Sequence, residues 1–140
     1  MKYLLDTCII SEVVRSNPNQ NVTNWLQSQD EQNLYLSVLT FGEIKKGIEK
    51  MAAGEKKSKL ELWLENDLKQ RFKGRILSVD MNTCNQWGVA QAQAESVGKP
   101  MPSIDGLIAA CALANNCIVV TRNTKDMQQG GVELINPWGL

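Results

Sequence analysis

Apolar and polar residues alternate along the chain in blocks that predict short strands separated by amphipathic helices. Apolar runs with the length of buried strands occupy residues 2–5, 34–39, 76–79, 117–121 and 132–135. Between them, apolar residues recur at helical spacing over residues 8–14, 21–29, 40–53, 56–72, 82–97 and 104–115. Strands that alternate with helices indicate an α/β fold with a mostly parallel sheet, and we expect residues 1–140 to form a single domain.

The stretch from residue 102 to 126 combines a helix start, a buried strand and a polar turn. Pro102 and Ser103 predict the helix start, with Ser103 capping free backbone N–H groups and Asp105 in the first turn. Small apolar residues, mostly alanine, allow this helix to pack closely against a sheet, and Asn115-Asn116 is expected to end it. The polar turn at 122–126 follows the strand.

A second helix start is expected directly after the strand at 34–39. Thr40 and Glu43 have the spacing of a capping box, in which the Glu43 carboxylate accepts a hydrogen bond from the backbone N–H of Thr40. Gly54 is expected to end this helix.

Acidic residues fall where the predicted strands end. Asp6 follows the first strand, Glu43 follows the second, and Asn123 and Asp126 follow the strand at 117–121. The carboxyl ends of parallel strands and the helix starts that they feed share one edge of the sheet, so we expect these side chains to lie close together. Asp105 joins them if its helix begins at the same edge.

The absence of histidine narrows the chemistry available to these acids. It excludes Ser-His-Asp and Cys-His triads and histidine-rich zinc sites. Clustered carboxylates repel one another unless a cation neutralises them, and oxygen ligands select hard ions such as Mg²⁺ or Mn²⁺. The pattern therefore predicts metal-assisted phosphodiester hydrolysis. A purely structural interpretation stays open, with Glu43 as a cap, Asp105 as a charge near a helix dipole and Asp6 as a turn former.

Charge and cysteine content say less about function than the acidic residues do. The formal net charge is zero, but residues 45–75 hold ten Lys or Arg against five acids, which fits either a path for a phosphate backbone or a solvated helix face. Cys111 and Cys117 lie in apolar stretches and are expected in the core, and no cysteine spacing suggests a disulfide framework or zinc site. We expect a cytoplasmic protein without a signal peptide or membrane span.

Four motifs, in order and at the right spacing, resemble the PIN domain. They are LLDTCIISE at 4–12, LTFGEIKKGI at 39–48, PSIDGLIAACAL at 102–113 and VVTRNTKD at 119–126, and the closing INPW at 135–138 is similar to the FitB-like branch. The closest likeness is to VapC-type and FitB-like toxins of toxin–antitoxin pairs. The resemblance implies a three-layer α/β/α sandwich and an Mg²⁺- or Mn²⁺-dependent ribonuclease.

The resemblance also implies roles for individual residues. Asp6 and Asp105 are expected as direct metal ligands and Glu43 as a ligand or water-orienting group. Asp126 or Asn123 completes the catalytic acids, since Asn123 stands where close relatives have Asp and Asp126 reaches the site if a helical turn begins there. Thr121, at a strand end, is expected to position a phosphate or an acid, and Thr7 belongs to the same supporting group.

A second departure from the family is Cys8, where Asn usually follows Asp-Thr. A thiol cannot replace the paired donor and acceptor of an amide, so a local hydrogen bond near Asp6 is expected to weaken and activity to fall.

Family membership further implies an RNA substrate, a homodimer and a cognate antitoxin that blocks the cleft and supplies the only contact with DNA. Trp25, Trp63 and Trp138 are candidates for core positions or for such contacts.

Two other functions remain open at the level of sequence. One is a nuclease for structured DNA, because carboxylate and metal chemistry does not select the sugar. The other is a catalytically weak or inactive module that binds RNA or a protein, which Asn123 and Cys8 leave possible.

Overall fold

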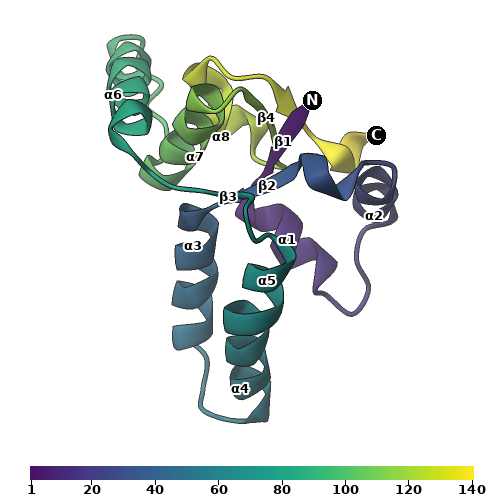
Figure 1. The fold of residues 1–140 in the computed structure, drawn as a ribbon. Coiled ribbons are helices and arrows are strands. Elements are labelled where there is room, and N and C mark those ends of the chain that lie inside the picture. Colours follow the sequence, from purple (N-terminus) through teal and green to yellow (C-terminus); the bar gives the residue numbers. More distant parts are fainter.

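A computed structural model describes all 140 residues as an α/β fold with a five-stranded parallel sheet (Figure 1). The strands are β1 (Lys2–Leu5), β2 (Leu34–Ser37), β3 (Ile76–Leu77), β4 (Cys117–Val120) and β5 (Leu134–Ile135), in the spatial order β3-β2-β1-β4-β5. β2 and β3 therefore lie on one side of β1, and β4 and β5 lie on the other side. This reversal places the carboxyl ends of β1 and β4 side by side, the position at which open α/β sheets bind ligands.

Helices follow or precede every strand. They are α1 (Thr7–Val13), α2 (Gln20–Gln27), α3 (Val38–Glu49), α4 (Glu55–Leu62), α5 (Lys69–Arg71), α6 (Met81–Ser96), α7 (Ser103–Ala114) and α8 (Thr124–Met127). A six-residue π-helical segment, η2 (Trp63–Leu68), joins α4 to α5. Figure 1 shows α3 lying beside the α4–η2–α5 segment, and together they form a hairpin that projects beyond the sheet.

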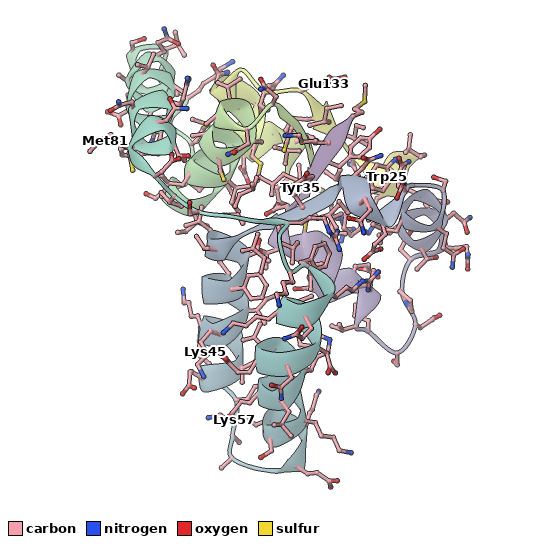
Figure 2. All side chains as sticks on the ribbon, viewed as in Figure 1. Trp25, Tyr35, Lys45, Lys57, Met81 and Glu133 are labelled. Carbon is pink, nitrogen blue, oxygen red and sulfur yellow. The ribbon has the colours of Figure 1, made fainter.

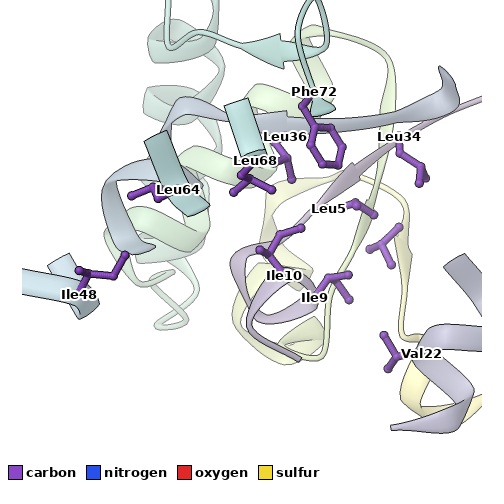
Figure 3. Packing of buried hydrophobic residues seen from close by; sticks show 11 residues of the cluster. Leu5, Ile9, Ile10, Val22, Leu34, Leu36, Ile48, Leu64, Leu68 and Phe72 are labelled. Carbon is purple, nitrogen blue, oxygen red and sulfur yellow. The ribbon is translucent and has the colours of Figure 1, made fainter. Parts of the chain in front are cut away.

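The two faces of the sheet bury separate apolar clusters, as expected for a three-layer sandwich. On β1, Leu5 belongs to a cluster with residues of α1, α2, α3 and η2 (Figure 3). Its neighbour Leu4 belongs to a second cluster, with residues of α7. Successive residues of a strand point to opposite faces, so one short strand anchors both layers. Each of Leu4, Ile9 and Ile108 is fully buried, and burial of such a side chain contributes about 1.5–3 kcal/mol.

Most elements lie where the sequence predicts them, but several boundaries were wrong. The strand expected at 34–39 stops at Ser37, whose side chain accepts a hydrogen bond from the Leu39 N–H and starts α3 two residues earlier than Thr40. The helix expected to reach residue 53 ends at Glu49, and Gly54 stands at the start of α4. The strands expected at 76–79 and 132–135 have two residues each.

Two predicted helix caps are also wrong, for the same kind of reason. Thr40 is buried inside α3, so the capping box with Glu43 does not form. Ser103 is the first residue of α7 rather than its cap, because Pro102 occupies the cap position and no side chain caps the helix. Asp105 nevertheless lies in the first turn, as predicted.

Other expectations about the core hold. Cys111 and Cys117 are buried. Trp25, Trp63 and Trp138 are partly buried and pack against the larger apolar cluster. None of the helices is both long enough and apolar enough to cross a lipid bilayer.

Candidate active site

Asp6 is the buried centre of the site. The register between β1 and β4 pairs Leu5 with Val120, so the next residues, Asp6 and Thr121, come together where the two strands end. Asp6 is 3% exposed; its Oδ1 accepts a 2.8 Å hydrogen bond from the Thr7 N–H and its Oδ2 accepts a 2.6 Å hydrogen bond from Thr121 Oγ1. The strand ends thus fix both oxygens of this carboxylate.

Cys8 lies against the same carboxylate. Its Sγ is 3.5 Å from Asp6 Oδ2 and 3.7 Å from Thr121 Oγ1, and it accepts a 3.4 Å hydrogen bond from the Arg122 N–H. Burial raises the pKa of the Cys8 thiol to about 11, and the negative charge of Asp6 acts in the same direction. The thiol therefore keeps its proton at neutral pH and donates it toward Asp6.

Glu43 reaches the site through a chain of hydroxyl groups. Thr7 Oγ1 donates a 2.5 Å hydrogen bond to Glu43 Oε1 and lies 3.0 Å from the buried Thr40 Oγ1. These contacts tie α1 to α3, and they replace the local capping role predicted for Glu43. Local sequence patterns do not indicate that Thr40 supports the site, because its partner Thr7 is 33 residues away.

Asp105 brings a third acid to the same place from α7. Burial raises the pKa of its carboxyl to about 6, and nearby negative charges add to the rise. Those charges are the carboxylates of Asp6, Asp126 and Glu43. The α7 helix consequently begins at the carboxyl edge of the sheet, and four acids share one region.

Asp126 lies in the short helix α8, which begins directly after Asn123. This is the helical turn that its participation requires. The backbone N–H of Asn123 donates a 2.9 Å hydrogen bond to Thr121 Oγ1, while the Asn123 side chain does not cap α8. Asn123 thus supports Thr121 through its backbone, and Asp126 supplies charge.

The donor set matches a hard divalent cation. The region offers carboxylate and hydroxyl oxygens, the chain has no histidine, and the adjacent thiol is protonated. No three Asp, Glu or Cys side chains converge closely enough to form a complete ligand cluster by themselves. Mg²⁺ usually takes one or two carboxylates and keeps several waters, so an incomplete protein shell fits Mg²⁺ or Mn²⁺.

Two clefts meet at Glu43, one on each side of α3. The larger, of about 610 Å³, is lined by Thr7, Val38, Leu39, Gly42, Glu43, Lys46, Gly47, Lys50 and Ile104. The smaller, of about 230 Å³, runs between α1, α3 and η2 and is mostly apolar, with Ile10, Val14, Ile44, Met51 and Trp63 among its lining residues. Both clefts share Thr7, Glu43 and Gly47.

Comparison with known proteins matches this architecture to one family. Residues 3–129 match the family model described as PIN domain. Over 135 residues, the chain is 38% identical to the plasmid stability protein StbB of Pseudomonas syringae pv. tomato, covering 96% of this chain and 97% of StbB.

Two further relatives are similar over the same length. The VapC ribonuclease Y4jK of Sinorhizobium fredii is 35% identical, covering 96% of both chains. The toxin FitB of Neisseria gonorrhoeae is 36% identical, covering 96% of this chain and 97% of FitB.

Among solved structures, FitAB bound to an IR36 DNA fragment contains a chain with the same fold. The TM-score is 0.93 at 36% identity, and the match covers 99% of this chain and 96% of the other.

Proposed function

We propose that this chain, which belongs to the PIN domain family, is an Mg²⁺- or Mn²⁺-dependent endoribonuclease toxin of a toxin–antitoxin pair. The observation that carries the proposal is the gathering of Asp6, Glu43, Asp105 and Asp126 at the carboxyl edge of β1 and β4. The names of two relatives, VapC ribonuclease Y4jK and toxin FitB, support the choice of RNA and of a toxin role.

The acids have distinct tasks in this proposal. Asp6 and Asp105 hold the metal, with Asp6 fixed by Thr7 and Thr121. Glu43, oriented by the Thr7 hydroxyl, binds the metal or orients the attacking water, and Asp126 contributes a further carboxylate beside Asp105. Bound there, Mg²⁺ or Mn²⁺ would lower the pKa of a water molecule and stabilise charge on a phosphoryl oxygen.

The apolar cleft between α1, α3 and η2 suits the antitoxin. Val14 is 47% exposed at its rim, and the cleft ends at Thr7 and Glu43, inside the acidic site. A partner segment seated there would cover exposed apolar surface and obstruct the site in the same step. Contact with DNA through the antitoxin belongs to the same proposal and is supported by the likeness to a chain of FitAB bound to DNA. A toxin homodimer is also part of the proposal.

Cleavage of mixed RNA by the purified, antitoxin-free chain tests the proposal. We expect cutting with Mn²⁺ that stops with EDTA and is lost in Asp6→Asn. Asp67→Asn, which neutralises an exposed acid on η2, is the matched control and should cut normally. Cutting that survives Asp6→Asn would refute the assignment.

Two additional measurements separate the other candidate functions. Preferential cutting of flapped DNA over single-stranded RNA would identify a DNA nuclease instead. A folded chain that neither cuts RNA nor binds Mn²⁺ in calorimetry would be a binding module.

A further inference from the structure

Basic side chains on the α3–α4 hairpin are not equally available to a ligand. Lys45 and Lys57 both lie on this hairpin (Figure 2). Lys45 forms a 3.1 Å ion pair with Glu49, and Lys59 forms a 3.2 Å ion pair with Glu55. Lys46 and Lys50 form no ion pair, and both line the larger cleft.

The unpaired lysines follow Glu43 along one face of α3. Positions 43, 46, 47 and 50 lie on the same side of a helix, since 3.6 residues make a turn. Lys46 and Lys50 are therefore one turn apart, about 6 Å along the axis, which is the scale of one nucleotide step. The face passes from an acidic end at Glu43 to a basic end at Lys50.

Two glycines in α3, Gly42 and Gly47, leave this part of the helix surface without side chains. A β-carbon added at Gly42 or Gly47 would meet no atom within 4 Å, so neither glycine is required for packing. Glycine inside a helix is unfavourable relative to alanine, yet both glycines line the larger cleft. Their bare backbone leaves room for a ligand to approach the helix closely.

The rest of the cleft lining includes exposed apolar side chains, from the first turn of α3 and from α7. Val38 is 42% exposed and Ile104 is 37% exposed, and both contribute to its lining. Ile104 immediately precedes Asp105, so this apolar surface adjoins the acids. Apolar side chains of this kind receive the flat face of an unstacked base.

We propose that the larger cleft binds the single-stranded RNA that flanks the cut site, with Lys46 and Lys50 contacting successive phosphates and Val38 and Ile104 supporting a base. The inference rests on the proposed function, because it takes RNA as the occupant. A volume of about 610 Å³ suits a few unpaired nucleotides, since sites for small ligands span about 300–1,000 Å³. A groove of this size along one helix favours an unpaired strand over an RNA duplex.

Binding of fluorescent single-stranded RNA to the Asp105→Asn chain, followed by anisotropy at several salt concentrations, tests the two lysines. Adding Lys46→Gln and Lys50→Gln together should weaken binding on the order of tenfold and lower the salt slope by about 1.4, since each phosphate contact on a single strand contributes about 0.7. Lys45→Gln, on the same helix but in an ion pair, is the control and should change neither. Duplex RNA should bind more weakly than the single strand.

A pair of glycine substitutions tests the shape of the cleft independently of charge. Gly47→Ala should raise the melting temperature and still weaken RNA binding, because the methyl group enters the cleft. Gly88→Ala, at an equally open position in α6, should raise the melting temperature and leave RNA binding unchanged.

The outcomes separate this inference from the proposed function. An unmodified chain that cuts RNA, with lysine variants that bind and cut equally well, would refute the cleft assignment alone. Lysine-dependent binding of RNA by a chain that never cuts would refute the nuclease alone. Lysine variants that lose antitoxin binding but keep RNA binding would assign the lysines to the antitoxin and refute the inference.

Discussion

The hydroxyl of Thr121 donates a 2.6 Å hydrogen bond to Asp6 Oδ2 across 115 residues of sequence. Both residues directly follow strand residues that face each other in the β1–β4 register. The sheet therefore holds the central carboxylate of the site in place before any ligand arrives, which is the kind of support that metal-binding carboxylates require.

Thr121→Val removes this hydrogen bond while keeping the shape of the side chain. Asp6 is buried, so we expect the free energy of unfolding to fall by about 1–3 kcal/mol. RNA cleavage should fall about 10–100-fold, the usual effect of removing a group that orients a metal ligand. Urea denaturation and the Mn²⁺-dependent cleavage rate measure the two effects. Thr121→Ser keeps the hydroxyl and should retain most of the stability and most of the cleavage rate. A fully active Thr121→Val would contradict the role of this hydrogen bond.

Cys8 is a weak substitute for an amide beside Asp6. Its contacts with Asp6 Oδ2 and the Arg122 N–H are 3.5 and 3.4 Å, lengths typical of sulfur. Cys8→Asn offers a stronger donor and a stronger acceptor, and we expect cleavage to rise severalfold. Cys8→Ala leaves the Arg122 N–H without this acceptor and should lower both stability and cleavage. Cleavage rates at saturating Mn²⁺, measured on equal amounts of folded protein, test whether an amide at position 8 supports Asp6 better than a thiol. A Cys8→Asn variant that cleaves more slowly than Cys8→Ala would instead show that the position requires a small side chain.

The pH dependence of stability should reveal the cost of burying an ionised Asp105 among other acids. The pKa of Asp105 is about 6 in the folded chain and 3.8 ordinarily, so the folded state takes up this proton more readily than the unfolded state. Ionised Asp105 thus destabilises the metal-free fold above pH 6, and the penalty is relieved as the pH falls through about 6 toward 4. We expect Asp105→Asn to melt a few degrees higher than the unmodified chain at pH 7.5 and to lose this advantage near pH 4. Melting curves in EDTA at both pH values test this. Equal melting temperatures at pH 7.5 would show that neither burial nor neighbouring charges penalise the ionised Asp105 carboxylate.

Bound metal should offset the destabilisation caused by ionised Asp105. At a hundredfold excess over its dissociation constant, a ligand that binds only the folded state adds about 2.7 kcal/mol. Mn²⁺ should therefore raise the melting temperature of the unmodified chain and of Asp67→Asn, and raise it far less in Asp6→Asn or Asp105→Asn. An equal rise in all four proteins would place the metal elsewhere.

Arg75 stabilises the fold away from the site. Its guanidinium is buried and donates to the carbonyl oxygens of Glu31, Leu34 and Arg71 at 2.7, 2.6 and 2.5 Å. Arg75→Met should lower the free energy of unfolding by about 2–3 kcal/mol, and Arg75→Lys should recover little, because an ammonium lacks the planar fork. Lys73→Gln, at an exposed neighbouring position, should change the urea midpoint very little. Cleavage per folded molecule should stay the same in all three variants, and a specific loss in Arg75→Met would link this network to catalysis.

The sequence by itself determined the order of helices and strands and the positions of the acids at strand ends. Local patterns suffice for this, because the alternation of apolar residues reports which side of an element is buried. Asp6 after β1 and Asp105 in the first turn of α7 follow from such local patterns. The helical turn that contains Asp126 was only a condition at the level of sequence, and the structure shows it.

Only the tertiary structure decided which of these residues touch. The capping interpretation of Glu43 was reasonable from a four-residue window, but Ser37 starts α3 earlier and Thr7, on another helix, becomes the partner of Glu43. Likewise, ion pairing with Glu49 separates Lys45 from its neighbour Lys46, which sequence alone treats as equivalent. Strand register and helix packing determine these partners, and neither can be read from the local spacing of residues.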